Sequence, residues 1–359
     1  MSKQRSSALI WLLLVLVVVL SLAGLFFVFE ASTAESFNQY GHQYHFVKRQ
    51  AIWLAIGFSV LLGAKFIPIH FWKKTSPFLF ITSLILMTLT LIPGIGLELN
   101  GARRWIKIGS LTTFQPVELM KLSVVLYFSS WMSEHQKLSS FLFLTALPSI
   151  LLLLQPDLGS LLILLVICIG LYFVAGGKIK TLVPVVGVGA LLLGAAIAAS
   201  PYRVKRFKTF LNPHTDPLGA SFHVRQITLA LGSGGWFGLG LGNSQQKYAY
   251  IPEASSDSIF AIVAEEIGFI GSSIIILLFA FYFALLLRSA QTQEADSYGR
   301  LVSLGVLIWL ASQVCLNLAA VVVLVPLTGL PLPFFSYGGS SLVMVLLANG
   351  LVLRSLRKK

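Results

Sequence analysis

Ten apolar segments, separated by polar connections, divide the chain along its length. They run over residues 8–29, 51–71, 77–92, 117–133, 139–154, 158–175, 181–199, 259–287, 301–324 and 339–353. A helix needs about 20 residues to cross the hydrocarbon core of a bilayer, so the third, fifth, sixth and tenth segments are short for a span. The pattern predicts an all-α polytopic membrane protein with about ten transmembrane helices.

Composition supports this class. The chain is 56% hydrophobic and 11% charged, whereas about a quarter of the residues in a soluble domain are charged. Cys168 and Cys315 both lie inside apolar segments, which argues against a disulfide or metal framework. The first apolar segment is longer than the core of a signal peptide, which is about 7–15 residues. We therefore expect it to be a retained helix.

One connection, over residues 200–258, is much longer than the others. It is rich in Gly, Pro, aromatic and basic residues, so we expect an ordered, functional segment rather than a linker. Residues 1–359 then form a single integral membrane domain with one large extracytoplasmic loop at about 200–258. Ten spans place both termini on one side, and the Lys and Arg bias of the short connections predicts that this side is cytoplasmic.

Basic residues on the outer side gather in two connections, 93–116 and 200–258. Outward Lys and Arg oppose insertion, so the cluster suggests an anionic partner. In PYRVKRFKTFLNP, apolar residues recur at near-helical spacing, which predicts a short helix in the membrane interface. The partner is either anionic membrane lipid or a diphosphate headgroup, and we expect no nucleic acid on this face. The candidate residues are Arg103, Arg104, Arg203, Lys205 and Arg206.

Four acids lie in YIPEASSDSIFAIVAEEIGFIG. On a helix that begins near Ser256, Asp257 continues a stripe of small residues, comprising Ala261, Ala264, Gly268 and Gly271. Such stripes allow helices to pack closely, so Asp257 is expected to face protein at the outer membrane edge. It is either a capping carboxylate or a carboxylate that faces substrate.

The other three acids of this segment carry separate predictions. Glu253 is expected in the loop before the helix. Glu265 borders the stripe and should have a polar partner in another span. Glu266 points to the opposite face and needs a separate partner in an adjoining span or protein.

Three further polar sets interrupt the apolar segments. Glu118 and Lys121 are three residues apart and so share a helical face; they form either a structural ion pair or part of a substrate path. Asp157, in LLQPDLGS, is either a turn or cap residue or a substrate contact. LPLPFFSYGGSSL breaks the helical pattern, so at membrane depth it must line a cavity or be covered by protein.

Seven motifs in order resemble the shape, elongation, division and sporulation (SEDS) family over nearly the whole chain. Within that family, GLGNSQQK followed by YIPEA resembles the FtsW and SpoVE members more than the RodA members. The motifs are NGARRWIKIG, FQPVELMK, LLQPDLGS, RFKTFLNPHTDP, GSGGWFGLGLGNSQQK, YIPEASSDSIFAIVAEEIGFIG and LPLPFFSYGGSS.

The resemblance implies a peptidoglycan glycosyltransferase of the bacterial cytoplasmic membrane. Such an enzyme polymerises lipid II into glycan strands at the outer face, for cell division or cell-shape maintenance, with a class B penicillin-binding protein as partner. Its essential acid corresponds to Asp257, although many members have Thr-Asp-Phe where this chain has Ser256-Asp257-Ser258. The substrate-binding candidates are Arg103, Arg104, Arg203, Lys205, Arg206, Glu118, Lys121 and Asp157.

Cofactor and alternative functions stay open at this point. A divalent cation, Mg²⁺ or Mn²⁺, would suit a diphosphate leaving group, but the sequence contains no evident ligand cluster. A lipid II transporter (flippase) would also place a charged pair beside broken helices. A non-enzymatic division or elongation scaffold would need no acid at position 257.

Overall fold

The computed structural model describes residues 3–99, 101–109, 112–133, 137–212, 221–248, 255–294 and 297–357. Ten helices coincide with the ten apolar segments, and the predicted helical membrane class is confirmed. Most boundaries differ from the prediction by a few residues, but the first helix continues well past Phe29. The ten are α1 (Lys3–Tyr40), α2 (His45–Phe66), α3 (Ile69–Thr90), α4 (Pro116–Met132), α5 (Leu138–Leu154), α6 (Leu158–Val174), α7 (Ile179–Ala198), α10 (Ile259–Gln291), α11 (Tyr298–Val321) and α12 (Gly339–Ser355).

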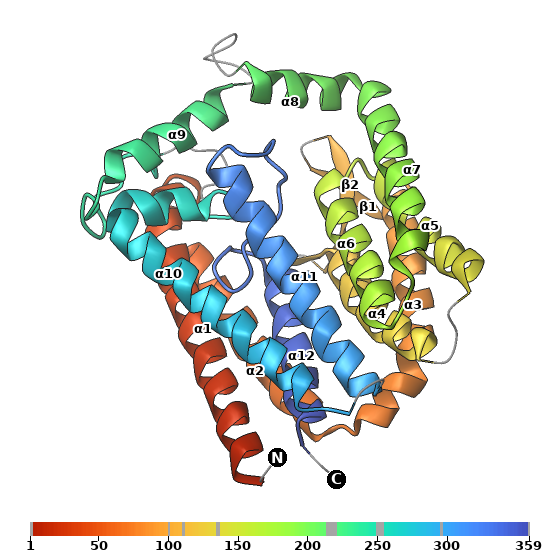
Figure 1. The fold of residues 1–359 in the computed structure, drawn as a ribbon. Helices are drawn as coiled ribbons and strands as arrows, with labels where there is room; N and C mark the ends of the chain where they lie inside the picture. Colours follow the sequence, from red (N-terminus) through yellow and green to blue (C-terminus); the bar gives the residue numbers. More distant parts are fainter. Residues whose placement is uncertain are drawn as a thin grey trace.

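The helices differ in length, and the short ones pack against longer neighbours. By length and composition, α1 (from Ser7), α2, α10 and α11 could each cross a membrane, whereas α5, α6, α12 and the Ile179–Ala195 part of α7 are apolar but shorter. The short α12 packs along α2 and α11, and α11 also packs against α6 and α10. Figure 1 shows α3 to α7 on one side of the bundle and α1, α2, α10, α11 and α12 on the other.

A small antiparallel sheet occupies the connection before α4, where the sequence predicted no regular structure. Its strands are β1 (Gly96–Leu99), β2 (Ala102–Ile108) and β3 (Thr112–Phe114), in the order β1-β2-β3. Leu97 pairs with Trp105, and Ile106 pairs with Phe114. Because successive strand side chains point to opposite faces, β2 separates Arg103 from Arg104.

Two shorter helices lie within the 200–258 connection, α8 (Pro201–Leu211) and α9 (Phe222–Gly234). The predicted short basic helix is confirmed as α8, with Pro at its first turn, where a missing N–H is tolerated. Figure 1 shows α8 lying across the end of the bundle opposite both chain termini. α9 packs against α10.

The helix α10 is broken at Gly268, whose φ of 67° and ψ of −170° are non-helical. Two backbone bonds that a continuous helix would form are replaced by bonds to the glycine-rich segment after α9. The N–H groups of Phe269 and Ile270 donate to the carbonyls of Gly235 and Trp236 at 2.9 and 3.1 Å. The prediction of one continuous small-residue stripe is therefore wrong, because the helix axis changes at Gly268.

The two carbonyl groups that would accept those bonds in a continuous helix also have partners outside the helix. The carbonyls of Glu265 and Glu266 accept from the N–H groups of Leu239 and Gly240, each at 3.0 Å. A side chain at Gly238 would meet the Glu266 carbonyl oxygen at 2.1 Å, so glycine permits this close approach. The segment 235–240 therefore completes the backbone hydrogen bonding of the break.

Candidate functional site

A cavity of about 660 Å³ surrounds the acid singled out from the sequence, and we call it the Asp257 cavity. Its lining residues come from the sheet, from α8 and α9, from the turn before α10 and from the segment between α11 and α12. The polar lining residues used below are Arg104, Arg206, His223, Ser256, Asp257 and Tyr337. The broken LPLPFFSYGGSSL segment was predicted either to line a cavity or to be covered by protein, and it does both: Pro331 and Tyr337 line the cavity, whereas Phe334 and Phe335 are buried.

Asp257 is half-buried and lies in a turn over residues 255–258. The helix begins only at Ile259, with Ser258 at the N-cap position, so the prediction that Asp257 lies in the first turn of a helix starting near Ser256 is wrong. This places Asp257 before the helix, where its side chain lines the cavity. Glu253 lies outside the described residues.

The backbone of this turn is held by α11 and by the segment after it. Asn317 Nδ2 donates to the Asp257 carbonyl and to the Leu330 carbonyl, both at 2.8 Å. The Ser336 hydroxyl donates to the Ser256 carbonyl, and the Tyr337 N–H donates to the Ser255 carbonyl at 2.8 Å. Because α11 and the segment after it both hold the turn, the backbone from which the Asp257 carboxylate extends is fixed in position at the cavity.

Arg104 reaches the cavity from β2 and is anchored on the turn between α5 and α6. Its Nε donates to the Gln155 carbonyl at 3.1 Å, and another guanidinium nitrogen donates to the Pro156 carbonyl. The guanidinium also lies 3.9 Å from Asp157. An arginine held in this way presents positive charge at a defined place.

Asp157 has the helix-capping role that was one of its two predicted interpretations. Its carboxylate accepts from the Ser160 N–H at 3.1 Å and from the Ser160 hydroxyl at 2.9 Å. It is 4% exposed, and its carboxylate helps to hold the Arg104 guanidinium in place. Its role as a direct substrate contact stays a prediction.

The other basic candidates separate into different surroundings. Arg103 pairs with Glu98 at 3.0 Å, with both side chains well exposed, on the other face of β2 from Arg104. Arg206 donates to the Leu327 carbonyl at 3.2 Å and lines the Asp257 cavity. Lys205 lines a neighbouring cavity of about 300 Å³, the α8 cavity, which Arg206 also lines. The side chain of Arg203 lies outside the described residues.

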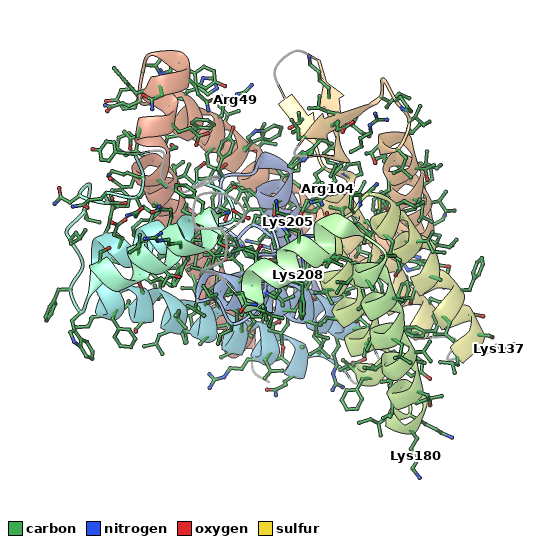
Figure 2. The ribbon with its side chains drawn as sticks, turned by 90° about the horizontal axis from the view of Figure 1, so that it is seen from above. Arg49, Arg104, Lys137, Lys180, Lys205 and Lys208 are labelled. Carbon is green, nitrogen blue, oxygen red and sulfur yellow. The ribbon has the colours of Figure 1, made fainter. Side chains whose placement is uncertain are left out.

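Positive charge therefore gathers near the centre of the end that carries α8. Figure 2, which views this end from above, shows Arg104 and Lys205 toward the centre of the view and Arg49 farther out. Arg206 connects the two cavities. The arrangement suits an anionic group bound beside Asp257.

The Glu118–Lys121 pair lies behind the Asp257 cavity. Lys121 Nζ donates to Glu118 at 2.8 Å and to Gln313 Oε1 at 2.9 Å, and the pair is almost fully buried. Gln313 in turn donates to the Pro331 carbonyl at 2.8 Å, and Pro331 lines the cavity. Since neither charged residue is among those that line the cavity, a direct substrate contact for them stays a prediction.

Glu265 and Glu266 are both buried, and their partners differ from the predicted ones. Glu265 accepts from the Ser244 hydroxyl and from the Gln245 N–H, which belong to the segment after α9 rather than to another span. Glu266 bonds Lys247 Nζ at 3.0 Å. The continuous-helix geometry used for the prediction ignored this segment, which follows α9 and packs against the break.

Lys247 joins the same region to α1. Its Nζ lies 3.5 Å from Glu30 as well as 3.0 Å from Glu266, and it is 5% exposed. This three-residue ion network was not predicted. The only sequence signal was that Lys247 and Glu30 are charged residues next to long apolar segments.

A further cavity of about 670 Å³, the Arg49 cavity, adjoins the Asp257 cavity through a shared wall of Trp105, Ser256, Tyr337 and Gly338. Arg49 and Lys107 line it together with aromatic side chains. Burial raises the pKa of the Tyr337 phenol, and Arg49 opposes that shift. Neither Arg49 nor Lys107 was among the candidate residues identified from the sequence.

A metal site is not assembled by the protein groups that the structure describes. Within those ranges no group of three or more His, Cys, Asp or Glu side chains is placed to hold a metal ion. The divalent cation therefore stays a prediction without assigned ligands.

Comparisons with known proteins cover almost the whole chain. Residues 9–359 match the FtsW/RodA/SpoVE family, described as "Cell cycle protein". The chain is 39% identical to stage V sporulation protein E of Bacillus subtilis, covering 95% of each sequence. It is 40% identical to a probable peptidoglycan glycosyltransferase FtsW of Thioalkalivibrio sp., covering 93% of this chain and 86% of the relative.

Solved structures agree with the sequence relatives. A chain of a peptidoglycan synthase complex, studied for the structural coordination of polymerization and crosslinking, matches with a TM-score of 0.79 and 29% identity over 96% of this chain and 97% of its own. Thermus thermophilus RodA matches with a TM-score of 0.71 and 29% identity over 96% of each chain. The sequence identities to SpoVE and FtsW exceed those to RodA, as the motifs predicted. The protein belongs to the FtsW, RodA and SpoVE family of multi-pass membrane proteins.

Proposed function

We propose that this protein is a peptidoglycan glycosyltransferase that polymerises lipid II, a disaccharide-peptide linked to undecaprenyl diphosphate. The names of its FtsW relatives support the activity, and the Asp257 cavity supplies groups for it. The observation that carries the proposal is the placement of one carboxylate, Asp257, beside Arg104 and Arg206 in a single cavity. Among the described lining residues of that cavity, Asp257 is the one carboxylate.

The reaction joins the acceptor sugar to the anomeric carbon of the donor sugar. The bond from that carbon to the diphosphate oxygen breaks, and its electron pair leaves with the diphosphate. The acceptor hydroxyl oxygen forms the new glycosidic bond, and its proton passes to the Asp257 carboxylate as general base. Arg104 and Arg206 stabilise the negative charge that develops on the departing diphosphate.

The neighbouring cavities fit the need to hold two large substrates together. Polymerisation requires a donor and an acceptor whose sugars meet at one point. The Asp257 and Arg49 cavities share a wall that includes Trp105 and Tyr337, and both contain cationic side chains. Aromatic walls suit sugar rings, and cations suit diphosphates, so adjacent cavities of this kind support a two-substrate reaction.

We further propose that the α8 end faces the outside of the cytoplasmic membrane and that both termini are cytoplasmic. The positive-inside bias of the short connections supports this orientation, and both termini lie at the end opposite α8 (Figure 1). A class B penicillin-binding protein is the proposed partner. A structural relative from a complex that coordinates polymerization with crosslinking supports that partner.

The test is polymerisation of purified lipid II by the purified protein, with and without the penicillin-binding partner. Asp257→Asn keeps the size of the side chain but removes the basic oxygen, so the rate should fall by about 10²–10⁴-fold, the usual effect of losing a general base. Glu294→Gln, at an exposed carboxylate, is the matched control and should polymerise normally. A rate for Asp257→Asn within a few-fold of wild type would refute the assignment.

The same variant separates the two rival functions. A flippase predicts that lipid II still moves across the bilayer when Asp257 is neutral. A scaffold predicts that Asp257→Asn supports growth and partner recruitment as well as wild type does. Loss of polymerisation in a folded, partner-bound Asp257→Asn protein would contradict both.

A further inference from the structure

A chain of hydrogen bonds connects Asp257 to a histidine on a different helix. His223 Nε2 lies 2.8 Å from the Ser258 hydroxyl, and that hydroxyl lies 3.2 Å from Asp257 Oδ1. Ser258 is fully buried, at 0% exposure. The hydroxyl therefore links the imidazole to the carboxylate through a path with no exposed oxygen between them.

The link depends on side chains that the local structure places together. His223 lies in the first turn of α9, and Ser258 is the N-cap residue of α10. Because α9 packs against α10, the imidazole meets the turn that carries Asp257.

His223 lies between two cavities. It lines both the Asp257 cavity and the α8 cavity. The other titratable groups that line these two cavities are Lys205, Arg206, Arg104, Asp257 and Tyr337. An imidazole is the side chain whose unperturbed titration falls near neutral pH, so it can exchange a proton between the carboxylate on one side and the basic α8 cavity on the other.

We propose that His223 receives, through the Ser258 hydroxyl, the proton that Asp257 takes from the acceptor sugar. This inference rests on the proposed role of Asp257. The step uses the imidazole tautomer that carries its hydrogen on Nδ1, and the Ser258 hydroxyl turns from Asp257 Oδ1, to which it donates here, toward His223 Nε2. Protonated Asp257 then gives its proton to Ser258 Oγ while the Ser258 hydroxyl gives its own proton to His223 Nε2. Asp257 returns to the carboxylate form, Ser258 is unchanged, and the imidazole becomes imidazolium, which releases the proton at the α8 cavity.

The relay predicts a specific dependence of the polymerisation rate on pH. Imidazolium cannot accept another proton, so the wild-type rate should fall on the acid side as His223 becomes protonated, and the range to measure is about pH 5–8, in which histidines change charge. His223→Gln keeps an amide that can hydrogen-bond the Ser258 hydroxyl but does not titrate in this range. Ser258→Ala removes the connecting oxygen. Each variant should polymerise about tenfold more slowly at neutral pH, a fraction of the effect of losing the base itself, and its acid limb should move to lower pH.

The experiment measures lipid II polymerisation by the purified protein with its penicillin-binding partner across this pH range. Ser258→Thr, which keeps a hydroxyl, should retain the wild-type position of the acid limb even if its rate is lower. His70→Gln, at an exposed histidine on α3, is the control and should leave the profile unchanged. Only variants that remain monodisperse and bind the partner are compared, and His223→Gln carries the test if Ser258→Ala does not fold.

Two outcomes separate failure of the relay from failure of the proposed function. If Asp257→Asn is inactive at every pH while His223→Gln and Ser258→Ala keep the wild-type acid limb, the relay is wrong and the general base stands. If Asp257→Asn polymerises normally, the proposed base is wrong and the relay falls with it. A lower rate with an unmoved acid limb indicates a merely structural role for His223.

Discussion

Replacing one member of the Glu118–Lys121 pair tests whether this buried pair supports the fold behind the cavity. The substitutions are Glu118→Met, Lys121→Met and the double change, since methionine is an uncharged side chain as long as glutamate and one atom shorter than lysine. Each single change leaves a charge in a site with almost no exposure. The remaining lysine would keep only the Gln313 acceptor at 2.9 Å and the Trp309 ring at 5.4 Å.

The size of the effect follows from the geometry. Unit charges at the observed 2.8 Å attract by about 6 kcal/mol at an effective dielectric constant of about 20. Desolvation offsets much of that attraction, whereas loss of one partner leaves the other charge uncompensated. Breaking such a pair costs about 3–5 kcal/mol, while apolar replacement of both members is close to neutral. Each single variant should therefore be destabilised by about 3–5 kcal/mol, and the double variant by less than either single one.

The measurement is the free energy of unfolding in mixed detergent micelles, followed by size-exclusion profiles and by lipid II polymerisation. A double variant whose destabilisation equals the sum of the two single ones would refute the reasoning, because independent sites add. If the double variant recovers both stability and polymerisation, the pair is structural. If stability returns without activity, the pair also supports the site through Gln313 and Pro331.

Three other changes test separate parts of the structure. Lys247→Met should destabilise the protein by about 3–5 kcal/mol in the same unfolding assay, because it leaves Glu266 buried without its cation; a loss below about 1 kcal/mol would contradict the ion network. Arg104→Ala should slow lipid II polymerisation by about 10²-fold with partner binding retained, and a wild-type rate would remove Arg104 from diphosphate binding. Asn212→Cys should react with an impermeant maleimide in intact cells, and reaction only after lysis would reverse the proposed orientation.

The helical architecture was predictable because long apolar segments carry a strong signal. α4, α6 and α12 begin within one residue of their predicted starts, since Pro, Asp and Gly mark those boundaries. The β2 strand was missed because its seven residues lie in a connection between apolar segments, and the sequence analysis considered only the basic charges of that connection. The break at Gly268 was missed because a lone glycine in an apolar segment does not reveal whether another segment supplies replacement hydrogen bonds.

Part of the site was predictable because charged residues stand out beside long apolar segments. Asp257 and Arg104 were identified from their charge and position, and the structure places both on one cavity. Arg103 was grouped with Arg104, but strand alternation directs the two side chains to opposite faces. His223 was not singled out, since its bond to Ser258 joins residues that are distant in the sequence and depends on the packing of α9 against α10.

The break in α10 also constrains how the protein is made. The backbone groups released at Gly268 would each cost several kcal/mol if they entered lipid without partners, yet their partners lie in residues 235–240, which precede α10 in the chain. Those residues leave the ribosome before α10 does, so the partners are already synthesised when α10 enters the membrane. We therefore expect the glycine-rich segment to matter during membrane insertion as well as in the folded protein, so that its removal lowers the amount of inserted protein rather than only its activity.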